Sequence, residues 1–211
     1  MNPIESKQSN SPLSKNDPKT GNQSATTSWP EPPGGILVWI IIVLELMTFG
    51  MGLAVFLWEG RTNGEMFRHG RAMLNQSIGL ANTIVLLTGG LFMANAVGKL
   101  RQGAVTAAKG WILASVGTGL LFLGLKGVEY ADKLHHGLDM HADRFFMFYW
   151  FLTGFHFIHV LVAVIILLVM WRGIQKGRYT PSNHEAVESS AIFWHMCDLI
   201  WLLLYPLIYL L

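Results

Sequence analysis

Charged residues are scarce in this chain of 211 residues, where they make up 13% of the sequence against roughly 25% in an ordinary soluble domain. The shortage is concentrated in five apolar stretches, residues 36–58, 77–97, 110–128, 145–171 and 189–211, which contain only Glu45, Lys126 and Asp198 as charged residues. About 20 apolar residues in a helix are enough to cross a hydrocarbon core of roughly 30 Å. We therefore expect a membrane protein and exclude a water-soluble enzyme.

Cysteine is almost missing as well. With Cys197 alone, the chain can form no intrachain disulfide, no CxxC metal site and no cysteine-ligated iron–sulfur cluster. The net charge is only +2 and the basic residues are scattered through the links, so we expect no nucleic-acid partner. No apolar run precedes Ile36, and we therefore expect no cleaved signal peptide.

The first 35 residues differ in composition from the rest of the chain. They hold six of the eight prolines and only a few large apolar residues, so they lack the apolar surface that ordering a chain requires. We predict a disordered polar tail over residues 1–35 and a membrane domain over residues 36–211.

Long apolar segments in lipid must satisfy their backbone polar groups internally, which favours helices over open strands. The predicted fold is therefore all-α, an integral membrane bundle of five transmembrane helices. Glycine and other small residues recur at four-residue spacing in the second and third stretches, which indicates close helix packing. Lys and Arg number nine in the tail and the second and fourth links against five in the others, which predicts a cytoplasmic N-terminus and an external C-terminus.

Ionisable side chains inside the predicted spans are the candidates for function, because each costs free energy in lipid unless it has a partner. The candidates are Glu45 in the first span, His156 and His159 in the fourth, His195 and Asp198 in the fifth, and Glu188 at the inner end of the fifth. At 1.5 Å per residue, Glu45, His159 and Asp198 lie at similar depth. We hypothesise that Glu45 meets His159, and that Asp198 is satisfied by His195 or by a tryptophan N–H.

Several interpretations of this polar layer stay open on the residues alone. The pairs either only fix which helices pack together, or they handle protons or bind a lipid. A more specific alternative is a haem group whose two axial ligands are histidines of different helices. His195, however, lies about 8 Å shallower than His159 by the helical rise. We therefore expect no catalytic residue, no metal ligand and no cofactor-binding residue in this chain.

The segment from Glu129 to Asp143 combines three histidines with several acids and superficially looks like a metal site. Zinc needs three or four ligands on a fixed scaffold. We therefore interpret this segment as a solvated acidic external loop. Lys126, three residues before Glu129, is expected to form an ion pair with it.

Longer motifs carry a resemblance to a known family. The run Leu152-Thr153-Gly154-Phe155-His156-Phe157-Ile158-His159-Val160 resembles the TGxHxxHV signature of cytochrome c oxidase subunit III, and residues 193–201 look like the WHFVDxxW helix of that family. Glu188 precedes His195 by seven residues, as the family's glutamate does. Glu45, the Asn82-Thr83 pair and the Glu129-Tyr130 pair match further family positions. The resemblance covers residues 36–211 in the expected order.

The resemblance has one large departure, because the first two of the seven helices of mitochondrial-type subunit III are missing. The five-helix form is similar to subunit III of quinol oxidases and to the accessory protein of bacterial nitric oxide reductase. Residues 127–134, 145–149 and 194–198 look most like the nitric oxide reductase type.

The resemblance implies a non-catalytic subunit without haem or copper of its own. Its partner would be the catalytic subunit of a haem-copper oxidase or a nitric oxide reductase in the bacterial cytoplasmic membrane, in the electron transport of aerobic or nitrate and nitric oxide respiration. There it would support proton uptake and the durability of the active site. On this interpretation Glu45, His156, His159, Glu188, His195 and Asp198 stabilise the bundle and contact membrane lipids, including a bound phospholipid. The alternative is an independent membrane redox carrier or transporter.

Overall fold

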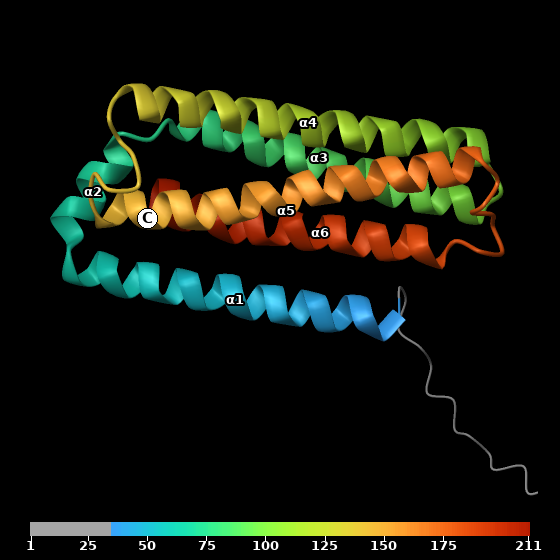
Figure 1. Cartoon of the computed structure of the whole chain (residues 1–211), viewed down its shortest axis with the longest axis horizontal. Helices are drawn as coiled ribbons and strands as arrows, with labels where there is room; N and C mark the ends of the chain where they lie inside the picture. Colours follow the sequence, from blue (N-terminus) through green and yellow to red (C-terminus); the bar gives the residue numbers. More distant parts are fainter. Residues whose placement is uncertain (1–34) are drawn as a thin grey trace, which may run out of the picture. The chain divides into compact units, whose positions relative to one another are not determined.

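The computed structural model describes residues 35–211. The polar tail predicted over residues 1–35 lies outside the described residues, except for Gly35. The described chain forms α1 (Gly35–Thr62), α2 (Gly64–Ala72), α3 (Gln76–Arg101), α4 (Val105–His135), α5 (Arg144–Gln175), α6 (Glu185–Tyr205) and a terminal π-helix η1 (Pro206–Leu210) (Figure 1). Residues 35–211 contain no strand, so the all-α prediction is confirmed.

Five of these helices are long and apolar enough to cross a membrane: α1, α3, α4, α5, and α6 together with η1. The number of predicted spans is therefore confirmed, whereas the cytoplasmic or external position of each end stays a prediction. Two ends of the bundle can be distinguished (Figure 1). One end carries α2, the α4–α5 link and η1, and we call it the α2 end. The other carries the α3–α4 and α5–α6 links, and we call it the opposite end.

Local signals explain where several helices begin and end. The side chain of Asn75 accepts a hydrogen bond from the Ile78 amide at the start of α3, and that of Asp143 accepts one from the Phe146 amide at the start of α5. Gly103 follows the end of α3 with a φ of 80°, a left-handed conformation that favours glycine. A link of only three residues, 102–104, therefore turns the chain from α3 into α4.

The predicted acidic loop over Glu129–Asp143 is wrong in its first half. Helix α4 continues to His135, and Glu129 is only 2% exposed within it. The sequence pattern marked the end of the apolar stretch, but the helical backbone continues beyond it because Glu129 has buried partners. The first link also holds an unpredicted short helix, α2, which buries Phe67 and Gly70.

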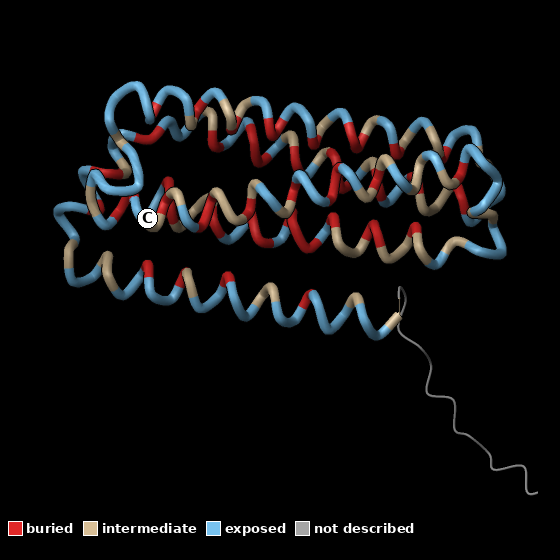
Figure 2. The backbone as a smooth tube through the Cα atoms, viewed as in Figure 1, coloured by how far each residue is buried: buried red, intermediate tan, exposed pale blue. Residues whose placement is uncertain are grey.

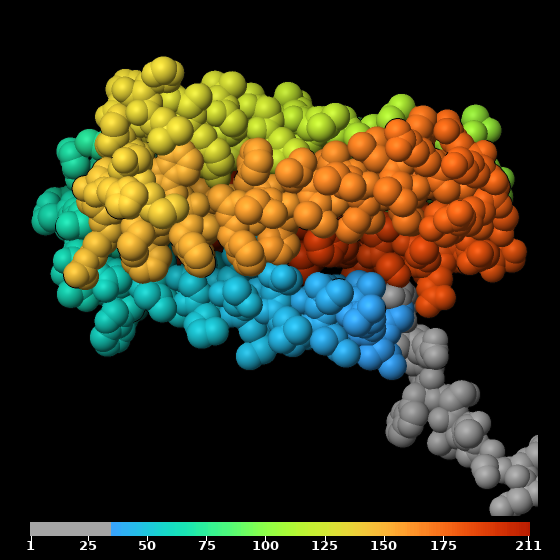
Figure 3. All heavy atoms as spheres, viewed as in Figure 1, coloured from blue at the N-terminus to red at the C-terminus, as the bar shows by residue number. Residues whose placement is uncertain are grey.

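Helices α3, α4, α5 and α6 form the core, and α1 lies against α6 and α5 on one side of it (Figure 1). Buried positions of the four core helices face one another, whereas α1 buries only Ile42, Phe49, Leu53 and Phe56 (Figure 2). Atoms of α6 are visible between α1 and α5 in the space-filling view (Figure 3). Helix α1 is therefore the least enclosed of the spans.

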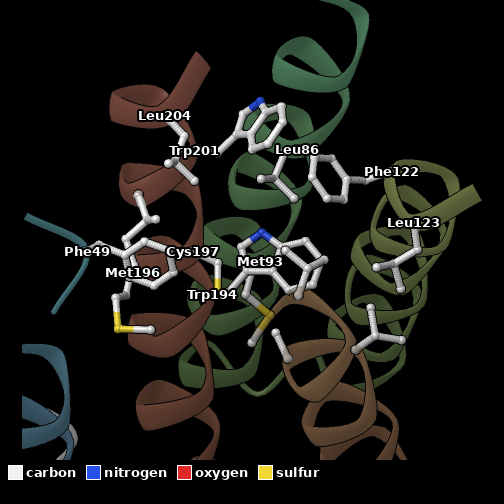
Figure 4. Close-up of a cluster of buried hydrophobic side chains, with 14 of the residues drawn as sticks. Phe49, Leu86, Met93, Phe122, Leu123, Trp194, Met196, Cys197, Trp201 and Leu204 are labelled. Atoms are coloured by element: carbon white, nitrogen blue, oxygen red, sulfur yellow. The ribbon is translucent and has the colours of Figure 1, made fainter. Parts of the chain in front are cut away.

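Large aromatic rings fill the core, and glycines make room for them. Trp194 and Trp201 of α6 lie beside Met93 of α3 and Phe122 of α4 (Figure 4). A Cβ atom at Gly119 would lie 2.5 Å from Val164 Cγ2 and 2.8 Å from the Trp194 ring. The close packing that the small residues predict is confirmed at this position, since the tryptophan occupies the space where a side chain would stand.

Substitution of Gly119 by alanine should lower the free energy of unfolding by about 1–3 kcal/mol, because the added methyl group overpacks the site. Chemical unfolding in detergent micelles measures this change. The matched control is Gly117→Ala, two residues earlier on the same helix, where a Cβ would meet no atom within 4 Å. Equal stability of the two variants would contradict the tight contact at Gly119.

Candidate functional site

Glu45 of α1 and His159 of α5 form the polar contact that connects the outlying helix to the core. His159 Nε2 lies 3.2 Å from Glu45 Oε2, and His159 Nδ1 lies 2.8 Å from the Phe155 carbonyl oxygen. Because a carbonyl oxygen can only accept, His159 Nδ1 carries a proton. The contact between His159 Nε2 and the Glu45 carboxyl group is then favourable when either of these two groups carries a further proton. The hypothesised pairing is therefore present in the structure.

Asp198 of α6 pairs with His195 one turn earlier on the same helix. The two side chains approach to 3.4 Å between His195 Nδ1 and Asp198 Oδ2. The carboxylate is packed against Gly90 of α3, where a Cβ would collide with Asp198 Oδ2. Of the two kinds of partner considered for Asp198, the structure selects His195. The Trp201 indole N–H donates to Thr83 Oγ1 at 3.0 Å, and the Trp194 indole N–H has no hydrogen-bond partner within residues 35–211.

His156 does not join either pair. Its side chain is fully buried, its ring stacks on Trp201 at 5.2 Å between centroids, and the edge of Phe122 lies 5.7 Å away. Neither ring nitrogen has a hydrogen-bond partner within residues 35–211. Burial without a hydrogen-bond partner disfavours an imidazolium charge, so we assign His156 to the packed core.

Glu188 lies at the opposite end of the bundle and connects α3 to α6. Its carboxylate accepts a hydrogen bond from Arg101 Nε at 2.7 Å, and His184 Nε2 lies 2.8 Å from the same oxygen. The six predicted residues thus occupy separate places: the Glu45–His159 contact, the His195–Asp198 pair, the aromatic enclosure of His156, and the Glu188 cluster.

The largest buried charged cluster was only partly predicted. The Lys126–Glu129 ion pair is confirmed at 3.0 Å, and the Lys126 side chain is fully buried. Its ammonium group also donates to Tyr149 and Tyr209, and four rings lie within 4.8–5.4 Å of it, those of Tyr130, Tyr149, Trp201 and Tyr209. Three acceptors therefore satisfy the three N–H groups of the lysine.

Glu129 completes this cluster from the other side. Its Oε1 atom accepts hydrogen bonds from Tyr149 at 2.9 Å and from Tyr209 at 2.7 Å, while Oε2 faces Lys126. A lysine within an apolar span is itself a signal for such a cluster. Its partner Tyr209 lies 83 residues further along the chain, and no local spacing connects the two.

A hollow of about 320 Å³ lies at the opposite end between α1, α3 and α6. Its lining combines apolar walls with the Arg101–Glu188 pair and His195. The lining residues are Trp39, Ala94, Val97, Arg101, Glu188, Ala191, Ile192 and His195. The side chain of His195 is 46% exposed toward this region. The hollow thus has a charged pair at one end and a histidine at the other.

The histidines and acids near the α4–α5 link approach one another only in pairs. His136 lies 3.5 Å from Asp132, and His141 lies 3.9 Å from Asp139. Within residues 35–211, no group of three such side chains is placed to hold a metal ion.

Replacement of Glu45 by alanine should lower the melting temperature of the detergent-solubilised chain, because His159 loses its partner at a cost of about 1–3 kcal/mol. Thr48→Ala serves as the control, since Thr48 lies one turn away and its hydroxyl bonds only to the Leu44 carbonyl of its own helix. A Glu45→Ala variant that assembles and melts like the parent would argue strongly against a stabilising contact.

Replacement of Glu129 by glutamine should lower the free energy of unfolding by about 3–5 kcal/mol, because the buried Lys126 charge is left without its counter-charge. The double variant Lys126→Met, Glu129→Gln should recover much of this loss, since it removes both charges. Glu65→Gln, which breaks the exposed Arg68–Glu65 pair, should leave the unfolding curve unchanged. A double variant no more stable than the single one would contradict the charge-pair explanation.

Comparison with known proteins agrees with this geometry. The family described as cytochrome c oxidase subunit III matches residues 69–211. The cytochrome c oxidase subunit 3 of Corynebacterium diphtheriae is 28% identical over 182 residues, 84% of this chain and 88% of that protein. That of Synechocystis sp. is 30% identical over 131 residues, 62% of this chain and 55% of that protein.

A third relative joins two subunits in one chain. The protein of Aeropyrum pernix described as heme-copper oxidase subunit I+III is 29% identical over 194 residues, which are 86% of this chain but 23% of that protein. The family match extends over most of the five-helix bundle and includes the His156, His159, His195 and Asp198 positions. The chain is therefore a multi-pass membrane protein that belongs to the cytochrome c oxidase subunit III family.

Proposed function

We propose that this chain is the subunit III of a haem-copper respiratory complex and that it packs against the catalytic subunit. The observation that carries the proposal is the family match over residues 69–211. The fused subunit I+III of Aeropyrum pernix supports it, because fusion places the two subunits of that protein in one complex. In this role the chain contributes to electron transport without catalysing a reaction itself.

The chain is proposed to carry neither haem nor copper, which reside in partner subunits. The engagement of its intramembrane histidines supports this proposal. His159 is held between Phe155 and Glu45, His195 is paired with Asp198, and His156 is enclosed by aromatic rings. Axial ligation by His159 would require its Nε2 contact with Glu45 to be given up, and ligation by His156 would require its aromatic enclosure to open.

The polar contacts are proposed to stabilise the bundle and to support proton uptake by the partner. The Glu45–His159 contact is the strongest candidate for the second role, because it brings two ionisable groups within 3.2 Å of each other inside a span. The hollow between α1, α3 and α6 is proposed to hold membrane lipid. Its apolar walls suit an acyl chain, and the Arg101–Glu188 pair lies where a headgroup would be.

Two kinds of catalytic partner fit this function. The curated relatives are named as oxidase subunits, whereas residues 145–149 and 194–198 resemble the nitric oxide reductase accessory form. For either complex we propose a bacterial cytoplasmic membrane as the location. We propose the oxidase as the partner, and treat the reductase as the alternative that the next experiment distinguishes.

Purification of the tagged full chain from its native membranes in mild detergent tests the proposal. We expect the chain itself to be colourless and a haem-containing protein to co-migrate with it, with reduction of oxygen by the isolated complex. Reduction of nitric oxide instead would identify the alternative partner. An unrelated tagged membrane protein from the same membranes is the control for non-specific capture.

A chain that remains a free monomer under all detergent conditions would count against the subunit assignment. An intrinsic haem spectrum in the isolated chain, or solute movement by the chain in vesicles, would support the redox carrier or transporter instead.

A further inference from the structure

Oxidisable aromatic side chains form a continuous row at the α2 end of the bundle. Four of the five tyrosines of the chain take part, together with one tryptophan. In order, the row runs Trp150, Tyr130, Tyr149, Tyr209 and Tyr205, with successive ring centroids 4.6, 6.2, 6.4 and 5.6 Å apart, and Trp150 also lies 5.8 Å from Tyr149 directly. We call these five residues the aromatic relay. At such spacing the ring edges are within a few ångströms, close enough for electrons to pass from one ring to the next.

The relay crosses the bundle from one side to the other. Trp150 and Tyr130, on α5 and α4, are half-buried at one end, and Tyr205, the last residue of α6, is half-buried at the other. Tyr149 and Tyr209, in the middle, are fully buried. The π-helix η1 places Tyr209 against Glu129 of α4 and Tyr149 of α5, and π-helical turns often occur at functional positions. Both ends of the relay are thus accessible, and the two middle rings are shielded.

Glu129 gives the two middle tyrosines a proton acceptor. Loss of one electron makes a tyrosine phenol a strong acid, so oxidation proceeds readily only where a base takes its proton. The Tyr149 and Tyr209 hydroxyls both donate to Glu129 Oε1, at 2.9 and 2.7 Å. A buried carboxylate that accepts from two phenols is the arrangement that such a step requires.

Lys126 lies beside this carboxylate and balances its charge. In the resting state the Lys126 ammonium neutralises Glu129 at 3.0 Å. Transfer of a phenolic proton to Glu129 leaves the ammonium without its counter-charge, and the four surrounding rings then stabilise the cation. The cluster of Lys126, Glu129 and the oxidised tyrosine then carries a net positive charge, which favours rapid transfer of an electron to it from a neighbouring ring. The relay therefore passes an oxidising equivalent on and does not store it.

We propose that the aromatic relay carries single oxidising equivalents across this subunit. The inference rests on the proposed function, because the oxidant is a high-valent haem or protein radical formed in the catalytic partner. One electron leaves Tyr149 or Tyr209 for that oxidant, and the phenolic proton moves to Glu129. The tyrosyl radical then takes an electron from a neighbouring ring: the other tyrosine of the pair, which has the same proton acceptor Glu129, or Trp150, whose indole can lose an electron without losing a proton. The proton held by Glu129 returns to the reduced phenolate. A soluble one-electron donor finally reduces Trp150 at the half-buried end.

Lys126 and Glu129 explain by themselves why phenols occupy this part of the core, because both residues hydrogen-bond to the hydroxyls of Tyr149 and Tyr209. A purely structural network and a relay nevertheless make different predictions. Tyr149→Phe keeps the ring but removes the hydroxyl and its hydrogen bonds, and it raises the oxidation potential beyond the reach of its neighbours. A structural network predicts only lower stability for this variant, whereas the relay also predicts a loss of radical transfer past this position.

The test uses the intact complex and the full chain. Hydrogen peroxide generates the high-valent haem in the complex, a nitroso spin trap captures radicals, and mass spectrometry locates the adducts. We expect adducts on the relay, and a several-fold loss of adducts at one end of it in both Tyr149→Phe and Tyr209→Phe. Tyr179→Phe is the matched control, because Tyr179 lies in the α5–α6 link at the opposite end. Melting temperatures verify that each variant is folded.

A second arm separates this inference from the subunit assignment. The full chain alone is oxidised by a photochemically generated one-electron oxidant, with the same trap and variants. Relay adducts that depend on Tyr149 in this arm support the relay even if no haem protein co-purifies. Adducts of equal yield in Tyr149→Phe and the parent, or a trap pattern without relay residues in both arms, would overturn the relay while leaving the subunit assignment intact.

Discussion

The structure depends on one constraint: a polar group within a lipid-facing bundle must find its partner inside the protein. The Lys126–Glu129 pair shows this most clearly, because a fully buried ammonium group draws Tyr149 of α5 and Tyr209 of η1 onto α4. The same requirement positions the remaining polar groups. Glu45 fastens α1 to α5 through His159, and Glu188 joins the start of α6 to Arg101 at the end of α3.

Glycine residues allow these contacts to form, because polar groups of two helices can meet only where the helix backbones approach closely. Gly90 leaves room for the Asp198 carboxylate, and Gly119 leaves room for the Trp194 ring. Helix α1 lacks such a fit over most of its length and buries four residues only. The core of the subunit is therefore the group formed by α3 to α6, with α1 held to it by fewer contacts, among them the Glu45–His159 contact. The hollow between α1, α3 and α6 lies along this less closely packed side of the core.

The candidate site could be predicted where partners share a helix or a depth in the membrane. The Lys126–Glu129 and His195–Asp198 pairs follow from spacings of three residues, and Glu45 and His159 were matched by depth. His156 was included as an ionisable residue within a span, three residues from His159, yet it faces Trp201 and Phe122. Depth along a helix does not fix the direction in which a side chain points, and that direction depends on how the helices are rotated against each other.

The sequence by itself determined the membrane setting, the five spans, the all-helical class and the family, because apolar run length and linear motifs are local properties of a chain. It also marked the polar residues that the spans could not expose to lipid. Only the tertiary structure decided that α4 continues through Glu129, that a π-helix carries Tyr209 onto Lys126, and that five aromatic rings form one row. Those features join residues up to 83 positions apart, and such contacts arise only when the helices pack.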